Sequence, residues 1–127
     1  MLPFTVELRS GLPLFGQVVY AVKKALASGQ LRPGDRFPSV RTLSQELKIN
    51  PNTAHKVIAT LVHEGLLDVQ PGVGTTVAKV AAATRAQRNA LLGDEVERLV
   101  VEAKRLGLEL EDLLQAARRQ WDRMEKE

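Results

Sequence analysis

Several features are missing from this 127-residue chain, and each absence excludes a class of protein. There is no cysteine, so the chain has neither a disulfide framework nor a thiolate metal site. No apolar run approaches the roughly 20 residues that span a bilayer. The N-terminus lacks the basic start and apolar stretch of a signal peptide. We therefore expect a cytoplasmic protein with no membrane partner.

The residues that catalysis or metal binding would require are also scarce. The chain has only two histidines, His55 and His63, and no carboxylate or thiol lies between them. They lie two turns apart on one predicted helix, which does not make a metal site. No set of nucleophile, base and acid is evident. We expect no metal, no cofactor and no enzyme activity.

The residues that are present suit a soluble protein with two different parts. Hydrophobic residues make up 44% of the chain and charged residues 26%. Residues 1–78 contain eight Lys or Arg and five Asp or Glu, a net charge of +3, whereas residues 79–127 contain ten of each. All the excess positive charge is thus in the first part, which favours an anionic partner for that part.

The first part begins with a segment of alternating apolar residues, which could be a short strand or a loose leader. A helix is predicted from Leu14, because apolar residues recur at helical spacing until Gly29. A second helix is predicted after Ser39, which is a good N-cap. Only Lys48 to Asn50 separate it from a third helix.

The third helix opens with an unusual set of residues. In "NPNTAHK", Asn50 can cap the helix and Pro51 can be its first residue, where a missing N–H costs nothing. The polar residues of the first two turns are poor or indifferent helix formers. They either cap the helix or face a polar partner.

The rest of the first part reads as strand, Pro/Gly turn and strand, ending at Ala78. The tail follows, with helical spacing from Thr84 to Leu106, an interruption at Gly107, and a last helix from Leu110 to Met124. These elements predict a mainly α fold with a small β wing. Residues 1–78 form a winged helix-turn-helix, and residues 79–127 form a short two-helix tail.

The stretch "LRPGDRFPSVRTLSQELKINPNTAHKVIATLVHEGLLDVQPGVGTTVA", residues 31–78, resembles the DNA-binding domain of GntR-family bacterial transcription regulators. The matching motifs are the Pro-Gly-Asp-Arg turn, Pro-Ser-x-Arg before the second helix, Glu-Gly-Leu-Leu and Gly-x-Gly-Thr. The segments "NPNT", "ELRSGLPLF" and "EAKRLGLELEDLL" are similar to the YtrA subgroup in particular. The resemblance covers nearly the whole chain.

The resemblance implies double-stranded DNA as the partner, with the N-terminal end of the third helix in the major groove. This agrees with the residue chemistry, because Asn pairs with adenine and Lys binds guanine or phosphate. The implied DNA-binding residues are Ser39, Arg41, Thr42, Asn50, Asn52, Thr53, His55, Lys56, Gly72, Gly74 and Thr75.

Two positions depart from many GntR proteins, which have Arg where this chain has Pro51 or His55. The exact sequence preference therefore stays open. Asn50 could serve only as a cap, since capping and phosphate contact can coexist. Gly72 and Gly74 do not open a helix, so they suit a wing tip better than a phosphate loop.

We expect a homodimeric regulator, a repressor, that binds an inverted-repeat operator. Two lone helices have little core of their own, so the tail is expected to dimerise. A small-molecule effector acting through the tail is left open. The expected dimer residues are Leu99, Leu106, Leu110, Leu114 and Trp121. Two other classes remain: a winged helix used only for protein contact, and an enzyme or small-molecule binding protein.

Overall fold

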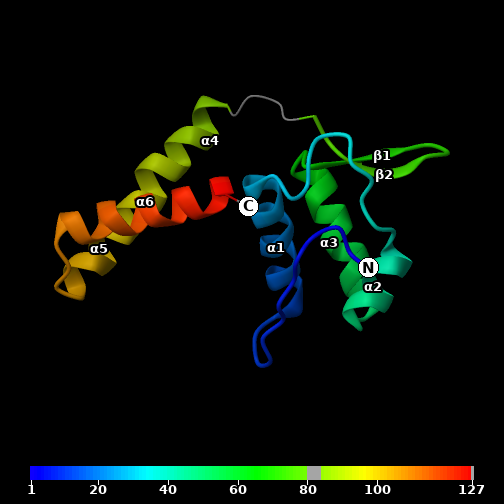
Figure 1. Ribbon diagram of the computed structural model, residues 1–127, viewed down its shortest axis with the longest axis horizontal. Coiled ribbons are helices and arrows are strands. Elements are labelled where there is room, and N and C mark those ends of the chain that lie inside the picture. Colours follow the sequence, from blue (N-terminus) through cyan, green and yellow to red (C-terminus); the bar gives the residue numbers. More distant parts are fainter. Residues whose placement is uncertain (80–83, 127) are drawn as a thin grey trace. The chain divides into compact units, whose positions relative to one another are not determined.

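The computed structural model describes residues 1–79 and 84–126 and divides the chain into two compact units, Met1–Val80 and Ala81–Lys126 (Figure 1). Both units are mainly helical, and the first also contains a two-stranded sheet. The expected fold class, mainly α with a small β wing and C-terminal helices, is therefore confirmed. None of the described helices is both long and apolar enough to cross a membrane.

Helix α1 (Leu14–Ser28) supplies one wall of the core of the first unit. It begins directly after Pro13, whose fixed φ suits a helix start, and ends before Gly29. Val18 and Val22 are fully buried along one stripe, as the helical spacing predicts.

The segment before α1 is neither a strand nor a loose leader. Phe4 is buried and stacks on Phe37, with ring centroids 5.5 Å apart. The backbone N–H of Thr5 donates to Oε1 of Gln30 (3.2 Å), and that of Arg9 donates to Oε1 of Gln17 (2.6 Å). Side chains of glutamine residues thus accept hydrogen bonds from this segment's backbone N–H groups, which in a strand would pair with a neighbouring strand.

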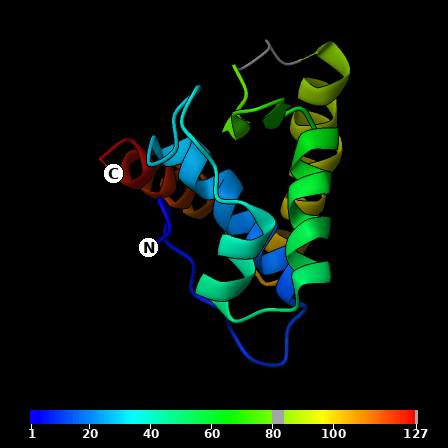
Figure 2. The same cartoon turned by 90° about the vertical axis from the view of Figure 1, so that its right-hand side faces the viewer.

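Helices α2 (Val40–Leu47) and α3 (Pro51–His63) pack against each other as the helix-turn-helix (Figure 2). The short connection depends on Lys48, which adopts a left-handed conformation with φ 55°. The next residue, Ile49, is buried and fixes the turn on the core. The start of α3 could be predicted from its cap. Asn50 is a favoured N-cap residue, and Pro51 is favoured at the first helical position.

Strands β1 (Leu67–Gln70) and β2 (Gly74–Val77) form the wing, an antiparallel ribbon with Gln70 opposite Gly74 at its tip. The segment before α2 pairs with β2. The N–H of Phe37 donates to the carbonyl of Thr75, and the N–H of Val77 donates to the carbonyl of Asp35, both at 2.8 Å. The wing is therefore tied by backbone hydrogen bonds to the chain that leads into α2.

The tail unit is built from two helical arms. The first arm runs continuously through α4 (Arg85–Asn89), the π-helical turn η1 (Ala90–Glu95) and α5 (Val96–Arg105) (Figure 1). Gly107, at φ 76°, ends this arm in a conformation that favours glycine. Helix α6 (Leu110–Lys126) is the second arm.

Candidate nucleic-acid interface

Helix α3 has one buried face and one polar exposed face. Ala54, Val57 and Leu61 are fully buried against the core. The opposite side presents a set of exposed residues, spaced three or four apart along the helix: Asn52, His55, Lys56, Ala59 and His63. The methyl group of Ala59 lies among longer polar side chains, so this face lets another molecule approach the helix backbone closely. Asn52, His55 and Lys56, which the sequence predicts to bind DNA, are thus exposed on this face, and their contact with DNA stays a prediction.

The N-terminal end of α3 is also exposed. Oδ1 of Asn50 accepts a hydrogen bond from the backbone N–H of Asn52 at 2.7 Å, so Asn50 is a true N-cap. The amide NH₂ group of Asn50 is a separate donor on the same exposed side chain. Pro51 follows at the first helical position. The positive end of the helix dipole therefore faces solvent, which favours an anion such as phosphate.

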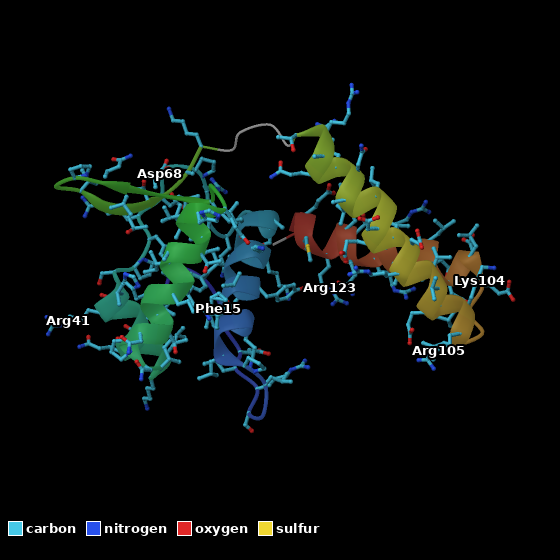
Figure 3. All side chains as sticks on the ribbon, turned by 180° about the vertical axis from the view of Figure 1, so that it is seen from behind. Phe15, Arg41, Asp68, Lys104, Arg105 and Arg123 are labelled. Carbon is cyan, nitrogen blue, oxygen red and sulfur yellow. The ribbon has the colours of Figure 1, made fainter. Side chains whose placement is uncertain are left out.

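Helix α2 contributes a second exposed N-terminus beside α3. Its cap is Ser39, whose Oγ accepts from the N–H of Thr42 and donates to Oγ1 of Thr42, both at 3.1 Å. These two hydroxyl groups thus have structural partners already. Arg41 is exposed and extends away from the body of the unit (Figure 3). Of the predicted residues on α2, Arg41 offers the cationic group.

The wing lies close to the start of α2. Ser39, Gly74 and Thr75 line one open groove of about 290 Å³, together with Ile58 from α3. Gly74 at the wing tip has a φ of 106°, which only glycine adopts without strain. The structure thus gathers Ser39, Gly74 and Thr75 around this groove. The other predicted residues lie along α2, at the start of α3 and at the turn of Gly72, and all of them are exposed except the half-buried Thr53.

One residue near this interface was not singled out from the sequence. The ring of Phe15, in the first turn of α1, lies beneath the ammonium group of Lys56, with Nζ 4.7 Å from the ring centroid. Figure 3 shows Phe15 on α1 between the helices of the first unit. An aromatic residue just after the start of α1 was visible in the sequence, but no pattern placed it next to Lys56, 41 positions later.

The predicted tail residues share a high exposure. Leu99, Leu106, Leu110, Leu114 and Trp121 are exposed by 54%, 59%, 68%, 49% and 70%. The indole N–H of Trp121 donates to Glu125 one turn along the helix, so its polar atom has a partner while the ring stays open to solvent. At the end of α5, Nε of Arg105 donates a hydrogen bond to Glu102, and this bond raises the pKa of the exposed Arg105 above its ordinary value. The described part of the tail thus exposes several large apolar side chains.

A helix-turn-helix followed by a β ribbon, with an exposed polar face on its second helix, defines a winged-helix protein of the DNA-binding class. Residues 14–77 match the model of the gntR family of bacterial regulatory proteins. The chain belongs to this family, in its YtrA subgroup, and its family and relatives are transcription regulators rather than enzymes.

The similarity to known proteins extends beyond the winged helix. The chain is 31% identical over 109 residues to the HTH-type transcriptional repressor YtrA of Bacillus subtilis, covering 85% of this chain and 84% of that protein. A crystal structure of a transcriptional antiterminator from Listeria monocytogenes has the same fold, with a TM-score of 0.81, 23% identity, and coverage of 95% and 91%. The DNA-binding domain of AraR in complex with operator ORX1 matches 59% of this chain and 96% of its own, with a TM-score of 0.52 and 29% identity.

Proposed function

We propose that this protein is a repressor that binds an inverted-repeat operator as a homodimer, with the N-terminal half of α3 in the major groove. The observation that carries the proposal is the exposed polar face of α3 on a winged-helix scaffold. Two similarities support it: the Bacillus subtilis relative is a transcriptional repressor, and the AraR domain was crystallised on an operator.

The roles of the individual residues follow from their chemistry and placement. Asn52 and His55 are exposed on the face of α3 and have side chains that hydrogen-bond to bases. Arg41 and Lys56 are exposed cations and suit phosphate or guanine. At the wing tip, Gly74 permits close approach of the backbone to phosphates or the minor groove.

Three further predicted residues have side-chain atoms in use. Ser39 and Thr42 hydrogen-bond each other, and Asn50 caps α3. The hydroxyl hydrogen of Thr42 and the amide NH₂ group of Asn50 remain for DNA contacts beside these structural roles, whereas Ser39 already donates its hydroxyl hydrogen to Thr42. Thr53 is half-buried at the side of α3, so we assign it a smaller share of the DNA contact than the exposed residues.

The tail, residues 79–127, is proposed as the dimerisation unit, because many of its large apolar side chains are exposed to solvent in the single chain. The π-helical turn η1 strengthens this argument. In η1 the N–H of Val96 donates to the carbonyl of Leu91, five residues earlier, so Leu91 and Leu92 both lie about one turn before Val96. Leu99 and Ala103 continue that face at ordinary α spacing. The first arm spans about 30 Å, long enough for a helix-on-helix dimer contact.

The test is a selection of bound sequences from random duplex DNA with the purified full chain, followed by sedimentation of the complex. We expect a pseudo-palindromic site whose half-sites lie about one helical turn apart, bound by two copies of the chain. Selection of single half-sites would overturn the dimeric arrangement. Failure to enrich any DNA would favour the alternative of a winged helix used for protein contact.

A further inference from the structure

The contact between Phe15 and Lys56 joins α1 to the exposed face of α3. Lys56 is exposed on α3, and its ammonium nitrogen lies 4.7 Å from the centre of the Phe15 ring. Phe15 is half-buried and packs against the core of the first unit. The ring is thus fixed by packing, and it offers the quadrupole of its face to a cation.

The position of Phe15 is set by the segment that precedes α1. The side-chain amide of Gln17 donates to the carbonyls of Arg9 (3.0 Å) and Leu12 (3.2 Å), and its oxygen accepts from the N–H of Arg9 (2.6 Å). These bonds close the loop onto the first turn of α1, where Pro13 already restricts the backbone. The first turn of α1, which carries the Phe15 ring, is therefore restrained both by Pro13 and by the hydrogen bonds of Gln17.

We propose that Phe15 is a positioning residue for DNA binding, which holds the ammonium group of Lys56 at the exposed face of α3 before DNA arrives. The proposal rests on the proposed function, because it requires that this face meets DNA. A free lysine side chain has many rotamers, and ordering it at an interface costs free energy. The aromatic face restricts those rotamers in the unbound protein while leaving the charge intact.

This role makes a specific prediction about salt dependence. The proposal takes the partner of Lys56 to be a phosphate. Lys56 would still neutralise that phosphate when Phe15 is replaced, so the number of released counterions is unchanged. Phe15→Leu should therefore weaken operator binding about two- to tenfold at every salt concentration, with the slope of log K against log salt preserved. Lys56→Ala should weaken binding and also flatten that slope by about one unit.

The experiment compares the full chain with Phe15→Leu, Phe15→Tyr, Lys56→Ala and the double variant Phe15→Leu/Lys56→Ala on the selected operator. Leucine keeps an apolar side chain against the core, and tyrosine keeps the aromatic face. We expect Phe15→Tyr to bind as the wild type does. We expect Phe15→Leu to have no further effect once Lys56 is alanine, because its only route to DNA is then gone.

A second measurement detects the contact without DNA. Because Nζ of Lys56 lies over the Phe15 ring, the NMR resonances of the adjoining ε-methylene protons should be shifted upfield in the wild type and in Phe15→Tyr. The shift should vanish in Phe15→Leu.

Each outcome is decisive for a stated claim. An equal loss from Phe15→Leu in the presence and absence of Lys56 would mean that Phe15 acts only through general stability, and the proposal would be wrong. A wild-type operator affinity for Lys56→Ala would also overturn it, while leaving DNA binding by the chain intact. If the wild type binds no DNA at all, the proposed function and the positioning role fail together.

Discussion

Asn50 has two separable tasks if α3 faces DNA, and two substitutions distinguish them. Its Oδ1 caps the helix by accepting from the N–H of Asn52 at 2.7 Å. Asn50→Ala removes this cap, at a cost of about 1 kcal/mol. The first unit spans residues 1–80, and for a domain of this size the loss corresponds to a decrease in Tm of about 4–8 °C.

Asn50→Asp keeps the cap, because aspartate is an equally good N-cap acceptor. The negative charge also interacts favourably with the helix dipole, so the Tm should stay level or rise. On DNA the effect reverses. A carboxylate about 8 Å from a phosphate is repelled by roughly 2 kcal/mol at an effective dielectric constant of about 20, before salt screening. The operator affinity should fall by tenfold or more.

The assay is a thermal melt and an operator titration on the wild type and both variants of the full chain. The expected pattern is a crossover, in which Asn50→Ala loses more stability and Asn50→Asp loses more affinity. Wild-type operator binding by Asn50→Asp would refute the reasoning. The N-terminal end of α3 would then lie away from the phosphates, and Asn50 would be a cap alone.

Other substitutions test the remaining parts of the interface. Asn52→Ala should cost about 1–3 kcal/mol on the operator and much less on scrambled DNA, because it removes a base-pairing amide without changing charge; equal losses on both duplexes would show that it only positions the helix. Arg41→Ala should weaken both duplexes and flatten the salt slope by about one unit, as titrations at several salt concentrations would show. Charged substitutions at Leu99 or Leu114 should reduce dimerisation and operator affinity together in sedimentation and binding measurements. A truncated chain ending at Ala78 that still dimerises fully would contradict the role of the tail.

The boundaries of the helix-turn-helix could be predicted because they depend on local chemistry. Ser39 and Asn50 act as caps through their own backbone neighbours, and Pro51 restricts only its own position. The segment around Phe4 was harder, since its alternation suits a strand, and the structure bonds its backbone to Gln17 and Gln30 instead. Those partners come from α1 and the turn after it, which no local pattern indicates.

The features that the sequence did not reveal are non-local or non-standard. The Phe15–Lys56 contact depends on how α1 packs against α3. The π-helical turn brings Leu91 as well as Leu92 to about one turn before Val96, whereas ordinary helical spacing selects Leu92 alone. Periodicity assumes one helix type throughout, so it misplaces a residue where the helix widens. The predicted DNA contacts and dimer residues stay predictions.

The packing of Phe4 on Phe37 has a consequence for how the winged helix can be isolated. The family similarity spans residues 14–77, but the hydrophobic core also contains Phe4. A fragment cut at the edge of the similarity would expose the ring of Phe37 and leave Gln30 without its bonds to Thr5. The folded unit is therefore longer than the segment that matches the family. Fragments for crystallisation or binding studies should begin before Phe4.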